Sequence, residues 1–378
     1  MGGRKDSWKT GVTMADVNGD GKLDMYVCYS GKLAGTKRMN QLFINTGNSA
    51  DGIPSFTEEA AQYGLADSAY STQAYFFDYD RDGDLDMLLI NHEVQFRSNL
   101  DQSIIEILLK TKDNLSNVKL YRNDDNHFSE VTDQSGLKAT VMTHGLSAGI
   151  ADINGDGWPD IYLSNDYREP DCLYMNNGNG TFTDKVQTSL GHISYFSMGD
   201  NVTDVNNDGF PDIFTLDMLP ETNSRQKLLF AADNYEKFEL NLQVGFYYEY
   251  MRNMLHINNG NGTFSEVGQL SGISNTDWSW APLFADYDND GWKDVYITNG
   301  FLHDYTNMDF LKYKGDFLQN RTTTIHIKTE DRIYRAIAVK VFIIHFCGFF
   351  IGCFALCIQS HIANYKIRLS ISIHIIYQ

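Results

Sequence analysis

Residues 152–160 read DINGDGWPD, and the same nine-residue pattern occurs four more times in the chain. The other copies are DVNGDGKLD at 16–24, DYDRDGDLD at 78–86, DVNNDGFPD at 204–212 and DYDNDGWKD at 286–294. All five fit Asp-x-Asp/Asn-x-Asp-Gly-x-x-Asp. Because Asp, Asn and Gly each make up only roughly 4 to 7% of an average protein, one chance match is about a one-in-a-million event per position. An internal repeat therefore organises the chain.

The spacing of the acidic residues predicts a calcium loop. Oxygen ligands at positions 1, 3 and 5 of a tight loop converge on one side, and Gly at position 6 allows the sharp turn. This matches the first half of an EF-hand loop, in which position 7 adds a backbone carbonyl, but Asp at position 9 closes the loop here. Calcium suits such a site because it accepts six to eight oxygens in flexible geometry. Metal-free Asx turns are the alternative, but they do not need an acid at position 9.

We expect about five Ca²⁺ ions, one in each loop. The side-chain ligands are Asp16, Asn18, Asp20 and Asp24; Asp78, Asp80, Asp82 and Asp86; Asp152, Asn154, Asp156 and Asp160; Asp204, Asn206, Asp208 and Asp212; and Asp286, Asp288, Asp290 and Asp294. The carbonyl ligands are those of Lys22, Asp84, Trp158, Phe210 and Trp292. Because 17 of these side chains are carboxylates, metal-free loops hold like charges together. Calcium is expected to stabilise the fold, and bridging a bound ligand is its alternative role.

Short apolar runs on both sides of each loop predict β-strands, as at 149–151 and 161–165. A second strand pair follows each of the first four loops. Its first strand reads QLFINT (41–46), KLYRN (119–123), CLYMN (172–176) or MLHIN (254–258). Asn-Gly turns at 176–180 and 258–262 predict hairpins, and turn chemistry explains their Asn-Gly-Thr sequons without glycosylation. Four strands and one metal loop per repeat predict an all-β fold, a β-propeller of four-stranded blades.

The loop, the Ala-Asp or Phe-Asp ending of the strand before it and the apolar strand after it resemble the FG-GAP or VCBS repeat of integrin α-subunit propellers. NQLFINTG (40–47), LYMNNGNGTF (173–182) and NMLHINNGNGTFSEVGQLSGI (253–273) are similar to the cartilage acidic protein-like family, whose repeats commonly precede an ASPIC/UnbV module. The resemblance covers roughly residues 8 to 315. It implies an integrin α-like propeller with seven blades in the parent protein, so five loops predict a fragment.

Composition and motifs narrow the function. The chain has 49 Asp and Glu against 30 Lys and Arg, a net charge of -19 that disfavours nucleic acid as a partner. No Gly-x-Ser-x-Gly, His-Glu-x-x-His, P-loop or dinucleotide-binding motif occurs. We therefore expect a non-enzymatic, extracellular or cell-surface adhesion module that binds a protein or a carbohydrate, where millimolar calcium would fill the loops. The alternatives are a glycan-active enzyme or its accessory domain, and a purely structural spacer.

Two insertions and a tail depart from the repeat. Within the predicted propeller of residues 1–331, the insertion 91–118 has helix-like spacing of its Ile and Leu residues. The insertion 219–252 is rich in aromatic residues that would either stack on a ligand or pack on the propeller. The tail 332–378 contains no Asp or Glu, and 341–358 has the length of a transmembrane helix. We interpret the tail either as a membrane anchor or as sequence foreign to the fold. The start, MGGRKDSWKT, lacks a secretory signal and reads like the middle of a protein.

Overall fold

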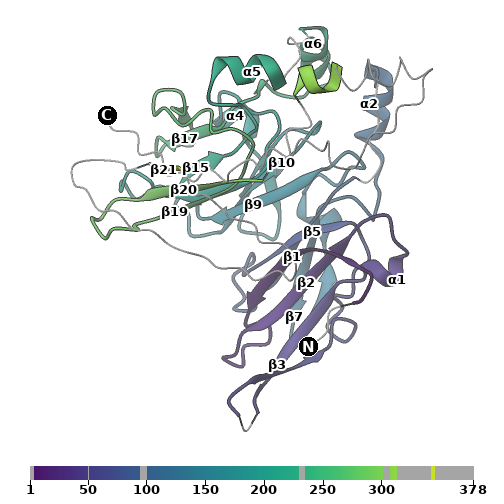
Figure 1. The fold of residues 1–378 in the computed structure, drawn as a ribbon. Coiled ribbons are helices and arrows are strands. Elements are labelled where there is room, and N and C mark those ends of the chain that lie inside the picture. The colour runs from purple at the N-terminus through teal and green to yellow at the C-terminus, as the bar shows by residue number, and fades with distance from the viewer. Residues whose placement is uncertain are drawn as a thin grey trace, which may run out of the picture.

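Short antiparallel strands joined by turns make up most of the chain (Figure 1). The structure, a computed structural model, describes residues 4–49, 51–93, 100–229, 235–300, 307–312 and 342–344.

Four successive four-stranded sheets and a fifth, three-stranded sheet follow the order of the chain. The first sheet is β1 (Trp8–Ala15), β2 (Asp24–Ser30), β3 (Gln41–Asn48) and β4 (Pro54–Glu58). The second is β5 (Ser71–Phe77), β6 (Asp86–Asn91), β7 (Lys119–Asp124) and β8 (His127–Glu130). The third is β9 (Gly145–Ala151), β10 (Asp160–Asn165), β11 (Cys172–Asn176) and β12 (Phe182–Asp184). The fourth is β14 (Asp200–Thr203), β15 (Asp212–Thr215), β17 (Met254–Asn258) and β18 (Phe264–Glu266). The fifth is β19 (Ser279–Ala285), β20 (Asp294–Asn299) and β21 (Phe342–Ile344).

The connections at the two ends of each sheet differ in kind. The nine-residue loops join the first strand of a sheet to its second, so all five lie at one end, which we call the loop end. Because neighbouring strands are antiparallel, the connections from second to third strand lie at the opposite end, which we call the cap end. Both insertions are connections of this second kind, so they lie at the cap end.

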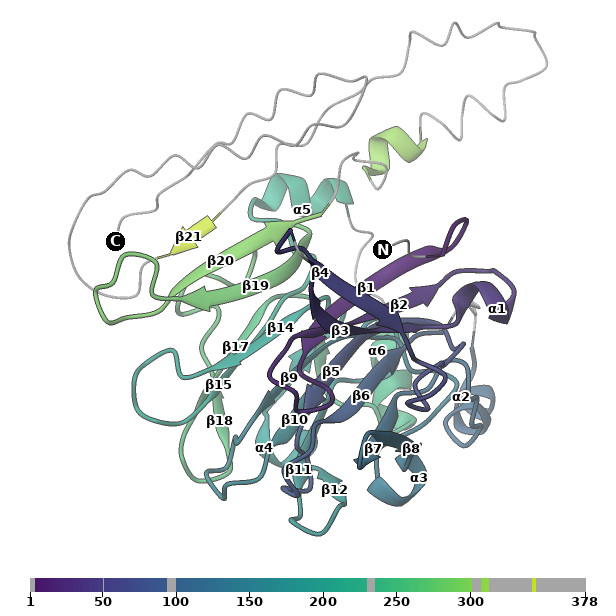
Figure 2. The ribbon, with the colours of Figure 1, turned by 90° about the horizontal axis from the view of Figure 1, so that it is seen from below.

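The sheets follow one another around an arc with their first strands innermost, as in the blades of a propeller (Figure 2). Contacts join β1 to β5, β5 to β9, β9 to β14 and β14 to β19. One hydrophobic core lies between each pair of neighbouring sheets, centred on Tyr26 and Leu89, on Leu88 and Ile161, on Tyr162 and Ile213, and on Phe214 and Val295. Side chains along a strand point alternately to its two faces. In the second, third and fourth sheets each face of the second strand borders a different core, so β6, β10 and β15 are buried along their whole length.

The outer faces of the first and last sheets are exposed. On β1, Val12 and Met14 are 54% and 53% exposed. Phe284 occupies the position in the last sheet that Met14 occupies in the first, two residues before the loop. It is only 8% exposed, because it lies in the core between the last two sheets. On β19, Leu283 points to the other face and is 53% exposed. No described sheet covers these two faces.

The helices are short and lie outside the sheets. The labelled helices are α1 (Gly35–Arg38), α2 (Gln102–Leu108), α3 (Thr132–Ser135), α4 (Val186–Ser189), α5 (Asn223–Leu229) and α6 (Tyr235–Gln243), and residues 308–312 form one further turn of helix. The two insertions meet, because Ile105 of α2 shares a small core with Phe246 and with Val141 and Met142. A further pair of strands, β13 (Ile193–Ser194) and β16 (Glu249–Tyr250), attaches the second insertion to the segment before the fourth sheet. Together the insertions form a cap, seen at the top of Figure 1 as α2, α5 and α6.

The structure confirms the all-β fold of four-stranded repeating sheets. The strands predicted at 172–176 and 254–258 are found with those bounds, and those predicted at 41–46 and 119–123 are one or two residues longer. The helix predicted in the insertion 91–118 is α2. The candidate membrane segment 341–358 lies outside the described residues except for β21, which pairs with β20. Within the described ranges, no helix is both long and apolar enough to cross a bilayer.

A close approach between the fourth and fifth sheets yields a stability prediction. A Cβ atom on Gly199 would lie 2.2 Å from the backbone oxygen of Trp280, so Gly199→Ala must push the sheets apart. We expect a loss of roughly 1 to 3 kcal/mol in the free energy of unfolding, measured by urea denaturation. Gly191→Ala is the matched control, because no atom lies within 4 Å of its added Cβ. Equal stability of the two variants would contradict the packing described here.

Candidate metal centres

All five nine-residue loops have the same internal hydrogen bonds. The Asp at position 1 accepts the N–H groups of positions 5 and 6 at 2.8 to 3.1 Å. The Asp at position 5 accepts the N–H of position 7 at 2.8 to 3.0 Å. These bonds turn the carboxylates inward onto the loop's own backbone, and the predicted convergence of positions 1, 3 and 5 on a calcium ion stays a prediction.

The backbone of each loop turns through left-handed conformations at positions 4 and 6. Position 6 is Gly in every copy, with φ between 81° and 101°. Position 4 also has positive φ in every copy, and the residues there are Gly, Asn and, once, Arg81 with φ 59°. Gly and Asn tolerate this conformation, whereas Arg does not readily adopt it. The guanidinium of Arg81 lies 5.2 Å from the ring of Trp158 in the next loop, so neighbouring loops touch.

Carboxylates gather most closely in the second and fifth loops. Asp78, Asp80 and Asp86 each place one oxygen within 4.8 Å of the others, and positions 1, 3 and 9 of the fifth loop do the same. These are the two loops with Asp at position 3. The Asp at position 5 is not a member of either group. In the remaining loops position 3 is Asn, whose Oδ1 accepts the N–H of position 5 at 2.9 to 3.1 Å.

In the first loop, a lysine of the loop pairs with one of the predicted ligands. The Nζ of Lys22 lies 2.7 Å from Oδ2 of Asp20, and this pair lowers the pKa of the Asp20 carboxyl. In the third and fourth loops the position 3 amide donates to the position 5 carboxylate instead, at 2.8 Å in both. Every loop thus offers only oxygen donors to a metal, which is the donor set that suits calcium.

The Asp at position 9 also braces the sheet. Its side chain is at most 4% exposed in all five loops. Oδ2 accepts the N–H of position 2 at 2.9 to 3.1 Å. In the first four sheets, Oδ1 accepts the N–H of an Asn near the end of the third strand at 2.7 to 2.8 Å; the four residues are Asn45, Asn123, Asn176 and Asn258. A single carboxylate at the start of the second strand therefore connects the loop that follows the first strand to the third strand.

The same asparagines extend the brace to the neighbouring sheet. Each donates its side-chain amide to the position 8 carbonyl of its own loop at 3.1 to 3.2 Å. Asn176 also donates to the carbonyl of Tyr79, at position 2 of the preceding loop, and Asn258 does the same to Ile153, both at 2.8 Å. The residue at position 2 thus makes two connections. Its N–H donates to the position 9 carboxylate of its own loop, and its carbonyl accepts a hydrogen bond from an asparagine of the following sheet. The sequence analysis identified the third strands but missed this role, although an Asn occurs at the same place in four repeats.

Burial makes it costly to ionise the position 9 carboxylates when no metal is bound. It raises the pKa of Asp86 to about 7 and the pKa values of Asp160 and Asp212 to about 6. Neighbouring loop carboxylates raise these pKa values further, whereas the two backbone N–H bonds oppose the rise. A divalent cation would remove this penalty by supplying the missing positive charge.

Because the carboxylate at position 9 binds buried N–H groups, we expect its removal to cost more stability than removal of the carboxylate at position 5, even without calcium. In a calcium-free buffer, Asp212→Ala leaves the buried N–H groups of Val205 and Asn258 without an acceptor. We expect a loss of about 2 to 4 kcal/mol in the free energy of unfolding. Asp208→Ala removes an exposed bond to the N–H of Phe210 and should cost less than about 1 kcal/mol. Similar losses in the two variants by urea denaturation would contradict the bracing role.

A second set of buried acids lies at the cap end and was not found from the sequence. Asp171, Asp200 and Asp217 are at most 9% exposed. Asp171 accepts the hydroxyls of Tyr162 and Ser197, each at 2.7 Å. Asp217 accepts the Ser194 hydroxyl at 2.6 Å and holds the backbone of the segment that follows. The patterns around these residues do not repeat along the chain, so nothing in the sequence marks them.

Asp200 provides a test of pH dependence. Burial raises the pKa of Asp200 to about 7, above its unfolded value of about 3.9. The folded state therefore binds more protons between these values, so the contribution of Asp200 to stability is present below about pH 4 and is lost as the pH rises through 7. Asp200→Asn cannot ionise and still offers an oxygen to the hydroxyl of Ser164.

We expect Asp200→Asn to gain stability relative to the wild type on going from pH 4 to pH 8, by on the order of 2 kcal/mol. Urea denaturation across this range measures the difference, with the exposed Asp51→Asn as a control. Parallel pH profiles of the wild type and Asp200→Asn would show that the buried carboxyl does not titrate as described.

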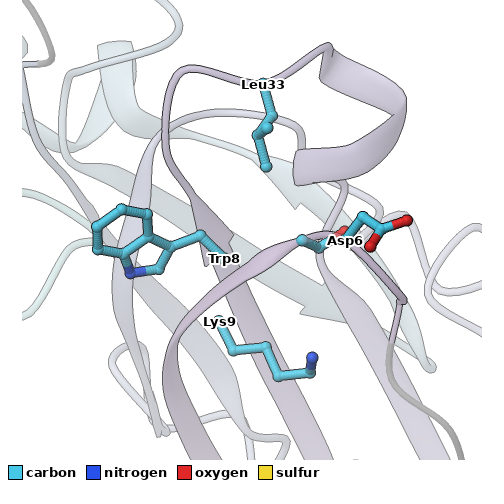
Figure 3. Close-up of a pocket in the computed structure, with 5 residues that line it drawn as sticks. Asp6, Trp8, Lys9 and Leu33 are labelled. Atoms are coloured by element: carbon cyan, nitrogen blue, oxygen red, sulfur yellow. The ribbon is translucent and has the colours of Figure 1, made fainter.

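Aromatic residues of the second insertion and the histidines near it differ in their surroundings. Phe246 of the second insertion is buried in the cap, whereas Tyr248 and Tyr250 are 45% and 40% exposed. His256 is buried beside His192, which contacts Glu266 and Arg252. His303 lies outside the described residues. An open pocket at the start of β1 contains Asp6, Ser7, Trp8, Lys9 and Leu33 (Figure 3). It lies at the other end of β1 from the first loop and includes none of the predicted ligands.

The repeated sheets and the loops at one of their ends define a β-propeller-like repeat protein. The model of the FG-GAP-like repeat matches residues 16–89, 105–163, 152–215 and 244–297, which together are more than half of the chain. The chain belongs to this family. The matches include all five loops. The ASPIC/UnbV association and the predicted fragment status have no support in this match.

The fold is also similar to several solved structures at low identity. An Agrocybe aegerita lectin that recognises non-reducing terminal N-acetylglucosamine has 15% identity and a TM-score of 0.39 over 80% of this chain and 65% of the lectin. The V. cholerae biofilm matrix protein Bap1 has 14% identity and a TM-score of 0.37 over 77% of this chain and 35% of Bap1. The Trypanosoma rangeli sialidase has 12% identity and a TM-score of 0.39 over 84% of this chain and 48% of the sialidase. The chain thus spans less than two thirds of the length of each of these three proteins. No curated protein matches the sequence.

Proposed function

We propose that this protein is a calcium-stabilised, propeller-type interaction module that binds a protein or glycan partner without catalysing a reaction. The observation that carries the proposal is the shared geometry of the five loops. In each, backbone bonds hold the position 1 and position 5 carboxylates in the same turn, and in two of them three carboxylates gather within 4.8 Å.

The chemistry of the donors supports calcium as the metal. Every side-chain ligand is a carboxylate or an amide oxygen, and there is no Cys or His in any loop to favour a softer metal. Position 9 would serve both as ligand and as brace, so binding at the loop would strengthen the connection between the loop and the third strand. Positions 1, 3 and 5, with the position 7 carbonyl, would complete the oxygen set around the ion.

The interaction role is supported by the division between the two ends of the sheets. The loop end is occupied by structural turns, whereas the cap end carries insertions of varied sequence, and such loops on a rigid scaffold are common binding elements. Extracellular or cell-surface action is part of the proposal, because free calcium there is high enough for weak loops to be filled. Seven blades, as in integrin α-subunits, are the closed form that we propose for the parent propeller.

Calcium titration of the whole chain tests the proposal. We expect the melting temperature to rise with calcium and about five ions to bind, because calcium binds the folded state and not the unfolded chain. Asp156→Ala and Asp208→Ala should each remove one ion, as measured by equilibrium dialysis, and reduce the calcium-dependent rise in melting temperature. Unchanged metal stoichiometry in both variants would contradict the site assignment.

A further inference from the structure

Tyr167 stands out at the cap end because its backbone is in a left-handed conformation. It follows β10, has φ 74° and is 41% exposed. Bulky side chains rarely adopt positive φ, and such strain tends to persist where function requires it. The strained residue here holds an aromatic ring at the surface of the protein.

Neighbouring rings fix the position of this side chain. The Tyr167 ring meets the imidazole of His144 edge to face, with 4.9 Å between the centroids and 90° between the planes. On another side the ring of Phe196 lies 6.2 Å away at 81°. His92 continues the row, 5.4 Å from His144. The aromatic row thus crosses from the second sheet to the segment that enters the fourth.

The two residues that precede Tyr167 in the chain carry acceptor atoms without donors among the described residues. Asp166 is 4% exposed, and its Oδ1 accepts no hydrogen bond within the described chain. The Oδ1 of Asn165, which is 2% exposed, also lacks a donor among the described residues. Buried polar atoms normally have hydrogen-bond partners. A ligand that satisfied these two atoms would have to bring N–H or O–H groups.

The electrostatic surroundings favour a positively charged donor. Asp171 and Asp217 are buried and act electrostatically on Asp166, and none of these three carboxylates forms an ion pair with a Lys or Arg among the described residues. Burial raises the pKa of Asp166 to about 7, and the charges of Asp217 and Asp171 raise it further. A cation bound beside Asp166 would offset both the cost of burying its charge and the repulsion from the neighbouring carboxylates.

We propose that Asp166 and Tyr167, with His144 and Phe196, form a binding site for an organic ammonium group at the cap end. The Asp166 carboxylate would accept hydrogen bonds from the ammonium, and the exposed aromatic ring would contact the cation and the carbon atoms next to it. This inference rests on the proposed interaction function and specifies its chemistry. A lysine side chain of a protein and an amino sugar of a glycan both carry this group.

Calorimetric titration of the whole chain at pH 6.5, where both amino probes are protonated, with 1 mM calcium would test the site. The probes are glucosamine and Nα-acetyl-lysine amide, each compared with its neutral acetylated form, N-acetylglucosamine or Nα,Nε-diacetyl-lysine amide. We expect at least one charged probe to bind at least tenfold more tightly than its acetylated form, and which charged probe binds identifies the source of the ammonium. Equal binding of charged and acetylated probes, or no binding of either charged probe, would overturn the proposal.

Two variants assign the binding to these residues. Asp166→Asn should weaken binding of the charged probe at least tenfold, and the exposed Asp51→Asn should leave it unchanged. Tyr167→Gly should also weaken binding at least tenfold, while the melting temperature stays the same or rises, because Gly adopts positive φ without strain. Unchanged affinity in either site variant would overturn the assignment.

Calcium separates this inference from the proposed function. If calcium raises the melting temperature of the wild type but the charged probes do not bind, the ammonium site is wrong and the calcium-stabilised module stands. If calcium has no effect on the wild type, the proposed function itself fails. Site variants that keep the calcium-dependent rise in melting temperature are folded, so their probe affinities can be compared directly with that of the wild type.

Discussion

The structure depends on one buried carboxylate per repeat. At position 9 of each loop an aspartate accepts the N–H of position 2 and, in the first four sheets, the N–H of a third-strand asparagine. Such a group is costly to bury as an ion, yet its hydrogen bonds hold the loop against the second and third strands. Three further oxygen-bearing side chains surround the same loop, and we propose that a calcium ion bound there neutralises the buried charge.

In the function that we propose, this arrangement separates stability from recognition. The loop end carries nearly identical turns, and Asn176 and Asn258 transmit the brace from one sheet to the next through position 2. The cap end has no such repetition, and its insertions meet over a core that includes Ile105 and Phe246. A rigid, repeated end thus supports a varied one, which allows side chains such as Tyr167 to be held in unfavourable conformations.

The repeat made much of the fold predictable. Each loop, strand and Asn-Gly hairpin leaves a periodic mark in the sequence, so the sheets and the helix around Ile105 follow from the sequence alone. The brace by Asn176 was missed because a strand pattern indicates burial and not the partner of a backbone N–H. Asp166 and Asp217 were missed for a different reason: their surroundings are assembled from segments distant in the sequence, and each occurs once. Calcium binding itself remains a prediction, since spacing defines donors and not occupancy.

The most direct test of the account is anomalous diffraction from crystals of the protein grown with calcium. The account predicts one calcium ion in each of the five loops, bound by the side chains of positions 1, 3, 5 and 9 and by the carbonyl of position 7. Crystals that diffract well but show no anomalous density at any loop would contradict it, and the loops would then be turns held by hydrogen bonds alone.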